Sequence, residues 1–121
     1  MPDWNKDELH RIGKAHESRL AGRRADGTLH RFVVVWQVQV DNKIYARSVN
    51  GAHAQWYRGT EETGEGRIEA GGVTRDVVFT REDLLDDRID DAYRLKYGTG
   101  SAVESITSER AISTTLRIDP A

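Results

Sequence analysis

The longest β-forming stretch of the chain is the apolar run from Phe32 to Val40. A tight Asp41-Asn42 turn and a second β-forming segment, Lys43 to Ser48, follow it. This pattern predicts a hairpin with three directly opposed pairs: Val40 with Lys43, Val38 with Tyr45, and Trp36 with Arg47. Both faces of the hairpin carry apolar side chains, so we expect a sheet that is covered on both sides, as in a closed or partly closed barrel.

Capping residues predict where the first helix begins. Asn5 and Glu8 have the spacing of a capping box, and Trp4 and Leu9 have that of a hydrophobic staple. We therefore expect a helix over residues 6–15 that lies across a sheet.

Three further helical segments are expected along the chain. Residues 52–59 form a short helical turn, and Thr80 with Asp83 resembles the cap of a helix that runs to Tyr97. Its apolar face is Leu85, Ile89, Ala92 and Tyr93, and Gly98 ends it. Ser101 with Glu104 indicates a short helix that ends near residue 108.

The remaining β-forming segments complete the expected architecture. They are residues 17–21, a hairpin of residues 67–70 and 73–79 about Gly71-Gly72, and residues 114–118, stopped by Pro120. Residues 61–66 between them are expected to be an exposed loop. The order of elements predicts a single α+β domain, residues 1–121, with a mainly antiparallel sheet.

Composition narrows the class of protein. The 121 residues suit one core, and a net charge of −2 gives no field that favours nucleic acid. The chain has no cysteine, which excludes disulfides, thiol catalysis and zinc–thiolate sites. The N-terminus has no signal-like apolar run, and no stretch is long enough to span a bilayer, so we expect a soluble cytoplasmic protein.

Candidate binding residues gather where the second strand of the hairpin ends. Arg47 and Arg58 are suited to grip a phosphate, because guanidinium groups match phosphate oxygens in bidentate fashion. Ser48 and the backbone at Asn50-Gly51 would complete the cradle, since glycine allows close approach of a ligand. The alternative is that Arg47 lies over Trp36 as a cation–π pair.

Aromatic residues next to this turn offer a second candidate role. Trp36, Trp56 and Tyr57 are suited to wall a planar ring, but such residues are more often core or dimer-interface residues.

Other chemistry finds no support in the sequence. The histidines show no metal-ligand spacing, and phosphate-loop and dinucleotide-binding fingerprints are missing. The acidic residues of the segment 82–91 alternate with arginines, which is typical of a solvated helix face with an i, i+4 pair from Asp90 to Arg94.

Several motifs occur in one order along the chain. They are Trp36-x-Val38, Tyr45-Ala46-Arg47-Ser48, Trp56-Tyr57-Arg58, Gly66-Arg67-Ile68, the run from Asp90 to Gly98, and Thr114-Thr115-Leu116-Arg117. Over residues 4–120 this pattern resembles a bacterial family known as domain of unknown function twenty-two fifty-five. That family in turn looks like the split β-barrel flavin and deazaflavin reductases, among them the deazaflavin nitroreductase branch, so we expect a split β-barrel of the flavin-reductase and pyridoxamine-oxidase-like fold.

The resemblance implies a small split-barrel homodimer that binds flavin mononucleotide (FMN) or a deazaflavin coenzyme at the barrel edge, without a metal. Ser48, Gly51 and Trp56 stand at places comparable to those of the nitroreductase branch. The expected function is then that of an oxidoreductase acting on a small molecule. The alternative is a cofactor-free dimeric binding or interaction protein on the same scaffold.

Overall fold

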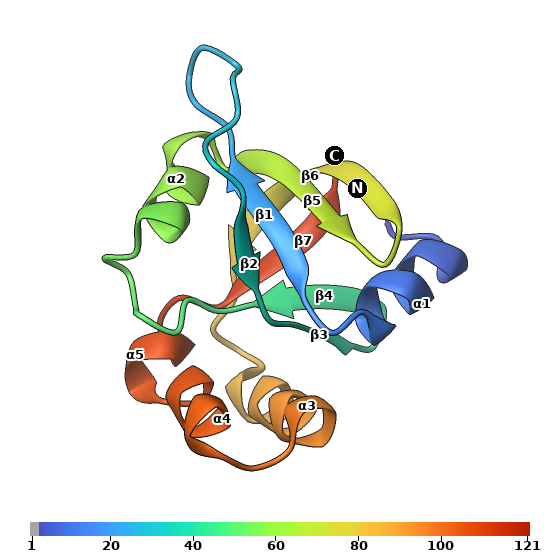
Figure 1. Cartoon of the computed structure of the whole chain (residues 1–121), viewed down its shortest axis with the longest axis vertical. Helices are drawn as coiled ribbons and strands as arrows, with labels where there is room; N and C mark the ends of the chain where they lie inside the picture. The colour runs from blue at the N-terminus through green and yellow to red at the C-terminus, as the bar shows by residue number, and fades with distance from the viewer. Residues whose placement is uncertain (1–2) are drawn as a thin grey trace.

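A single antiparallel sheet of seven strands curls into a nearly closed barrel with helices on its outside (Figure 1). The computed structural model describes residues 3–121. The strands are β1 (Ser18–Gly22), β2 (Val33–Val35), β3 (Gln37–Val40), β4 (Lys43–Ala46), β5 (Glu65–Ala70), β6 (Val73–Arg81) and β7 (Leu116–Pro120). The helices are α1 (Lys6–Lys14), α2 (Gln55–Thr63), α3 (Asp86–Tyr97), α4 (Ser101–Ile106) and α5 (Glu109–Ile112). This arrangement confirms the expected α+β split barrel.

One continuous segment of the chain, residues 33–40, forms both edges of the sheet and so closes the barrel. The strand order is β2-β1-β5-β6-β7-β4-β3, so the two outermost strands are neighbours in sequence, separated by Trp36 alone. The first half of the segment pairs with β1 and the second half with β4. The expected uninterrupted strand from Phe32 to Val40 is therefore wrong, because its two halves serve opposite ends of the sheet.

The register of the predicted hairpin is confirmed for two of its three pairs. Val38 pairs with Tyr45 and Val40 with Lys43. Trp36 and Arg47 do not pair, since β3 starts at Gln37 and β4 ends at Ala46.

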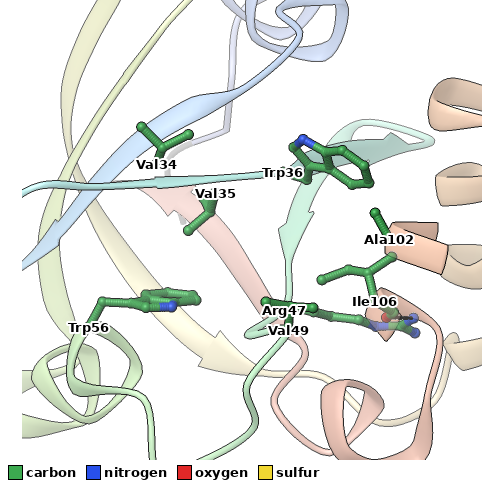
Figure 2. A pocket seen from close by; sticks show the side chains of 8 residues that line it. All are labelled: Val34, Val35, Trp36, Arg47, Val49, Trp56, Ala102 and Ile106. Atoms are coloured by element: carbon green, nitrogen blue, oxygen red, sulfur yellow. Dashed lines mark hydrogen bonds between the residues drawn. The ribbon is translucent and has the colours of Figure 1, made fainter. Parts of the chain in front are cut away.

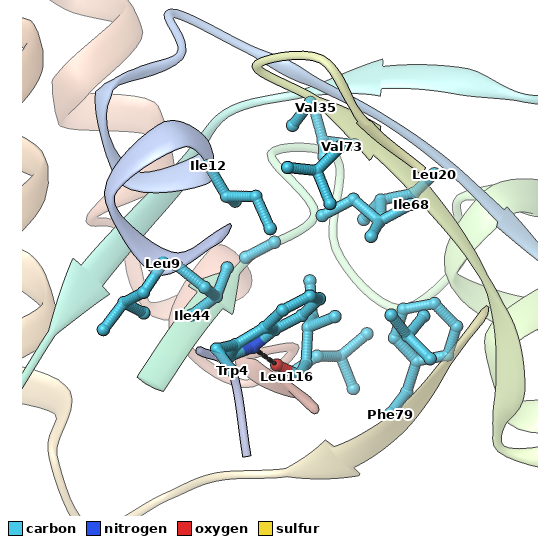
Figure 3. Close-up of a cluster of buried hydrophobic side chains, with 14 of the residues drawn as sticks. Trp4, Leu9, Ile12, Leu20, Val35, Ile44, Ile68, Val73, Phe79 and Leu116 are labelled. Carbon is cyan, nitrogen blue, oxygen red and sulfur yellow. Dashed lines mark hydrogen bonds between the residues drawn. The ribbon is translucent and has the colours of Figure 1, made fainter. Parts of the chain in front are cut away.

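Two apolar cores cover the two faces of the hairpin, as the sequence predicted. The core inside the barrel (Figure 3) includes Trp4, Leu9, Ile12, Leu20, Val35, Ile44, Ile68, Val77, Phe79, Leu116 and Ile118. The second core lies between the hairpin and helices α3 to α5 and consists of Val38, Val40, Tyr45, Ile89, Tyr93, Ile106 and Ala111. The face expected for α3 thus packs as predicted.

Helix α1 plugs one end of the barrel. The capping box is present, with the Glu8 amide donating to Asn5 Oδ1 at 2.8 Å. The indole of Trp4 donates to the Ile118 carbonyl at 2.9 Å, and Gln37 Nε2 donates to the Ile12 carbonyl at 2.8 Å. These bonds satisfy buried polar groups where the helix meets the barrel.

Several expected helix boundaries are corrected. Helix α2 begins at Gln55 and continues through Thr63, so the expected exposed loop 61–66 is divided between this helix, the turn at Gly64 and β5.

Helix α2 crosses β1 closely: a Cβ atom on Gly22 would lie 2.3 Å from the Gly59 carbonyl oxygen. Only residues without side chains permit that approach, which fixes the position of α2 over the barrel.

The C-terminal third also differs from expectation at three points. Thr80 lies within β6, and α3 begins at Asp86 without a side-chain cap, because β6 runs on to Arg81. The expected Ser101 cap is not formed; α4 follows Gly100, and a separate helix, α5, is capped by Ser108. Strand β7 extends to Pro120, which pairs with Val77 at the strand's end, where proline is tolerated.

Across residues 3–121, no helix has the length and apolar character needed to cross a membrane.

Candidate functional site

An apolar cleft opens where the barrel is split, and Figure 2 shows its walls. It is lined by Val34, Val35, Trp36, Arg47, Val49, Trp56, Ala102 and Ile106, with a cavity volume of about 240 Å³. Strand β2, the exit from β4, the start of α2 and the inner side of α4 each supply part of the wall. We call this hollow the apolar cleft.

Trp36 forms a rigid part of this wall. Its ring stacks on Tyr97 with centroids 4.0 Å apart and an interplanar angle of 4°. Its carbonyl accepts a hydrogen bond from Tyr93 Oη at 3.0 Å, and the next carbonyl, that of Gln37, accepts from Lys96 Nζ at 2.7 Å. Side chains of α3 thus hold the backbone at Trp36, where β2 ends and β3 begins, and the stacked indole is held in one orientation.

Burial shifts the pKa values of the three α3 side chains that hold this backbone, Tyr93, Lys96 and Tyr97. Burial raises the pKa of Tyr93 and Tyr97 above the ordinary tyrosine value, and it lowers the pKa of Lys96 to about 8. None of these three side chains lines the apolar cleft.

Arg47 is the most deeply buried charged side chain near the cleft. Its guanidinium donates to Thr115 Oγ1 at 2.8 Å, to the Ile106 carbonyl at 3.2 Å and to the Asp90 carboxylate. It lies over the ring of Tyr93, 5.6 Å from the centroid. The donors of this group are therefore directed toward α3, α4 and the start of β7, while the side chain still borders the cleft (Figure 2).

These contacts correct two sequence expectations. The aromatic partner of Arg47 is Tyr93 and not Trp36, because the predicted strand pair is broken at Trp36. The expected i, i+4 pair from Asp90 to Arg94 is absent: Asp90 binds Arg47, and Arg94 pairs with Asp91 at 3.4 Å.

The other expected site residues do not gather in one place, since some are buried and others are exposed. Ser48 and Tyr57 are buried; the Ser48 amide donates to Thr114 Oγ1 at 2.8 Å, and Tyr57 belongs to the inner core. Asn50 and Arg58 are exposed and do not line the apolar cleft. Gly51 takes a left-handed turn with φ 84°, packed against the stem of Arg110.

Trp36, Arg47 and Trp56 are the expected residues that the structure brings to the apolar cleft. Trp56 is half-buried at the start of α2, where it meets Tyr57 edge to face at 6.1 Å. Sequence reasoning missed Val49, Ala102 and Ile106. Val49 directly follows the expected strand exit, which was a usable signal, whereas the approach of α4 has no local signal.

The lining of the apolar cleft contains no carboxylate, histidine or lysine. A mainly apolar lining of this kind is suited to bind and shield an apolar body. Among residues 3–121, no cluster of histidine and carboxylate side chains is arranged to hold a metal ion.

The sequence identifies the family. The model of the bacterial family DUF2255, described as uncharacterized protein conserved in bacteria, matches residues 8–118, and the chain belongs to this family. A search of the curated proteins finds no significant match.

Solved structures share the fold at low sequence identity. HutZ, the heme storage protein from Vibrio cholerae, aligns with a TM-score of 0.69 at 14% identity, over 100% of this chain and 92% of its own. The conserved hypothetical protein Rv2991 from Mycobacterium tuberculosis aligns with a TM-score of 0.61 at 14% identity, over 98% and 80%. An F420 reductase aligns with a TM-score of 0.60 at 12% identity, over 98% and 96%.

The burial of Arg47 leads to a stability prediction. Replacing Arg47 with Met leaves the Asp90 carboxylate without its cation, and we expect the free energy of unfolding to fall by about 3–5 kcal/mol. Urea denaturation followed by circular dichroism measures the change. The control is Arg94→Met, which removes an exposed arginine of α3 that pairs with Asp91, and it should cost less than about 0.5 kcal/mol. Equal effects of the two substitutions would show that the Arg47 network is not structural.

Proposed function

We propose that this protein binds FMN or a deazaflavin coenzyme, with the ring system in the apolar cleft, and that it acts as an oxidoreductase on a small molecule. The observation that carries the proposal is the cleft itself. Two indoles, those of Trp36 and Trp56, border a hollow that is otherwise lined mainly by aliphatic side chains at the split of the barrel (Figure 2). The same fold in an F420 reductase supports this assignment.

The residues present fit a planar heteroaromatic ring. Aromatic faces and branched aliphatic groups supply flat, dry contact area, and Trp36 is already held rigid by Tyr97. A cavity of about 240 Å³ is smaller than most complete ligand sites, so it suits the ring portion of a larger ligand.

A flavin-type ligand fits this cleft better than haem, the ligand named for the neighbour HutZ. Haem iron is held by axial side chains such as histidine, methionine, cysteine or tyrosine. The apolar cleft is lined by none of these residue types.

A flavin or deazaflavin supplies hydride chemistry when it is bound, so the protein's contribution is binding, orientation and the exclusion of water. Val35 and Ile106 are buried and make the inner wall dry, while Trp56 is half-buried at the entrance. A cleft without acid–base side chains agrees with that division of labour.

Filling the cleft tests the proposal. Ala102 is exposed and lines the cleft, so Ala102→Trp should occlude the ring site without disturbing the core. We expect a loss of FMN and deazaflavin binding of at least about tenfold, measured by flavin fluorescence titration. Ser101→Trp adds the same bulk to the neighbouring exposed position of α4, outside the lining, and should leave binding unchanged. Binding that survives Ala102→Trp, or a wild-type protein that binds neither cofactor, would contradict the proposal.

The alternative function, a cofactor-free dimeric binding or interaction protein, is favoured by a separate observation. Large apolar side chains are exposed: Val34 on the edge strand β2 is 58% exposed, Leu84 86% and Leu95 91%. Such residues on a strand edge (Val34), in a loop (Leu84) and on a helix (Leu95) often mark contacts between chains.

On that basis we propose a homodimer in either functional case. Light scattering after size exclusion should give twice the 13.7 kDa chain mass at micromolar concentration. The chain mass itself would contradict the dimer. A dimer that binds neither FMN nor a deazaflavin would support the alternative function.

A further inference from the structure

A second hollow adjoins the apolar cleft and differs from it in charge. It has a volume of about 530 Å³ and is lined by Arg24, His30, Arg31, Phe32, Val33, Val34, Gln55 and Trp56. We call it the basic hollow. Val34 and Trp56 line both hollows, so one wall continues from the apolar cleft into the basic hollow.

Arg31 is the principal charge of the basic hollow. The side chain is exposed, and within residues 3–121 its guanidinium makes no ion pair or hydrogen bond. Arg47, by contrast, is buried, and its donors are taken up by Asp90, Thr115 and the Ile106 carbonyl. A guanidinium with unused donors beside an aromatic wall is suited to bind a phosphate in bidentate fashion.

The neighbours of Arg31 are already ordered by the β1–β2 connection. Arg24 Nη1 donates to the Leu29 carbonyl at 2.9 Å and to Thr28 Oγ1 at 3.3 Å, which fixes the side chain through one of its guanidinium nitrogens. His30 Nε2 lies 2.9 Å from Glu62 Oε1, and Glu62 also accepts from the Ala25 amide. This arrangement anchors the connection to the end of α2 and gives the basic hollow a defined shape.

Negative charge is scarce around the basic hollow. No acidic side chain lines it, although Glu62 contacts His30 and Asp26 lies near Arg24. The first turn of α2, which supplies Gln55 and Trp56, contains no acidic residue and has no side-chain cap. An anion entering here therefore meets two arginines with no carboxylate on the lining itself.

We infer that the basic hollow binds the phosphate end of the ligand whose ring lies in the apolar cleft, and that Arg31 is the residue that selects for this phosphate. The identity of the ring rests on the proposed function, whereas the phosphate site rests on the basic hollow alone. The anion is thus assigned to the entry of β2 and not to Arg47 and Arg58, where the sequence predicted it.

A matched pair of ligands tests this inference, since FMN and riboflavin differ only by the phosphate. We expect wild-type protein to bind FMN about tenfold more tightly than riboflavin, the preference worth one charge-assisted phosphate contact. Arg31→Gln should abolish that preference and leave riboflavin affinity unchanged. Arg58→Gln is the control, because Arg58 is also exposed but lines neither hollow.

A second arm uses inorganic pyrophosphate and needs no flavin. Titrated into labelled protein, pyrophosphate should shift the nuclear magnetic resonance signals of the His30 and Gln55 amides and the Trp56 indole in the wild type, and in Arg58→Gln, but not in Arg31→Gln. If neither FMN nor a deazaflavin binds and these shifts occur, the proposed function fails and the phosphate site stands. The phosphate site is overturned if Arg31→Gln weakens phosphate binding no more than Arg58→Gln in both arms.

Discussion

The buried guanidinium of Arg47 joins the barrel to helices α3 and α4, which pack on its outside. It leaves β4 at the point where the barrel wall ends and bonds to Asp90 on α3, to the Ile106 carbonyl at the end of α4 and to Thr115 before β7. A cation removed from water is tolerated only when its donors are satisfied, so the helices must take up positions that present those acceptors. The second core and the inner wall of the apolar cleft, to which Ile106 belongs, follow from that requirement.

Closure of the barrel supplies the other half of the cleft. Because one segment of chain serves both ends of the sheet, it has to change direction at Trp36, and β2 is left with an unpaired edge. The tyrosines of α3 and Lys96 hold that break through the carbonyls of Trp36 and Gln37. The same bend that completes the barrel therefore presents an aromatic face to the apolar cleft.

Features governed by local physics could be predicted from the sequence. The capping box at Asn5, the register of the tight hairpin at Val38 and Val40, and the buried face of α3 each depend on neighbours within a few residues. The break at Trp36 could not be predicted, because it depends on pairing with β1 and β4 at opposite ends of a sheet. The local charge pattern paired Asp90 with Arg94, whereas a buried arginine 43 residues away takes its carboxylate.

At the candidate site, too, residues close together in sequence could be predicted, and distant contributions could not. Trp56 was found because it adjoins the strand exit, and the contribution of α4 was missed because nothing in residues 101–106 signals a ligand. Arg47 acts as a structural cation, and we propose that the charge of the ligand is met at Arg31 instead. The Nε–H signal of Arg47, followed by nuclear magnetic resonance in hydrogen-exchange experiments and in titrations with FMN and riboflavin, tests this assignment most directly. We predict a slowly exchanging proton whose shift is the same with FMN bound as with riboflavin bound. Rapid exchange, or a further shift with FMN over that with riboflavin, would contradict it.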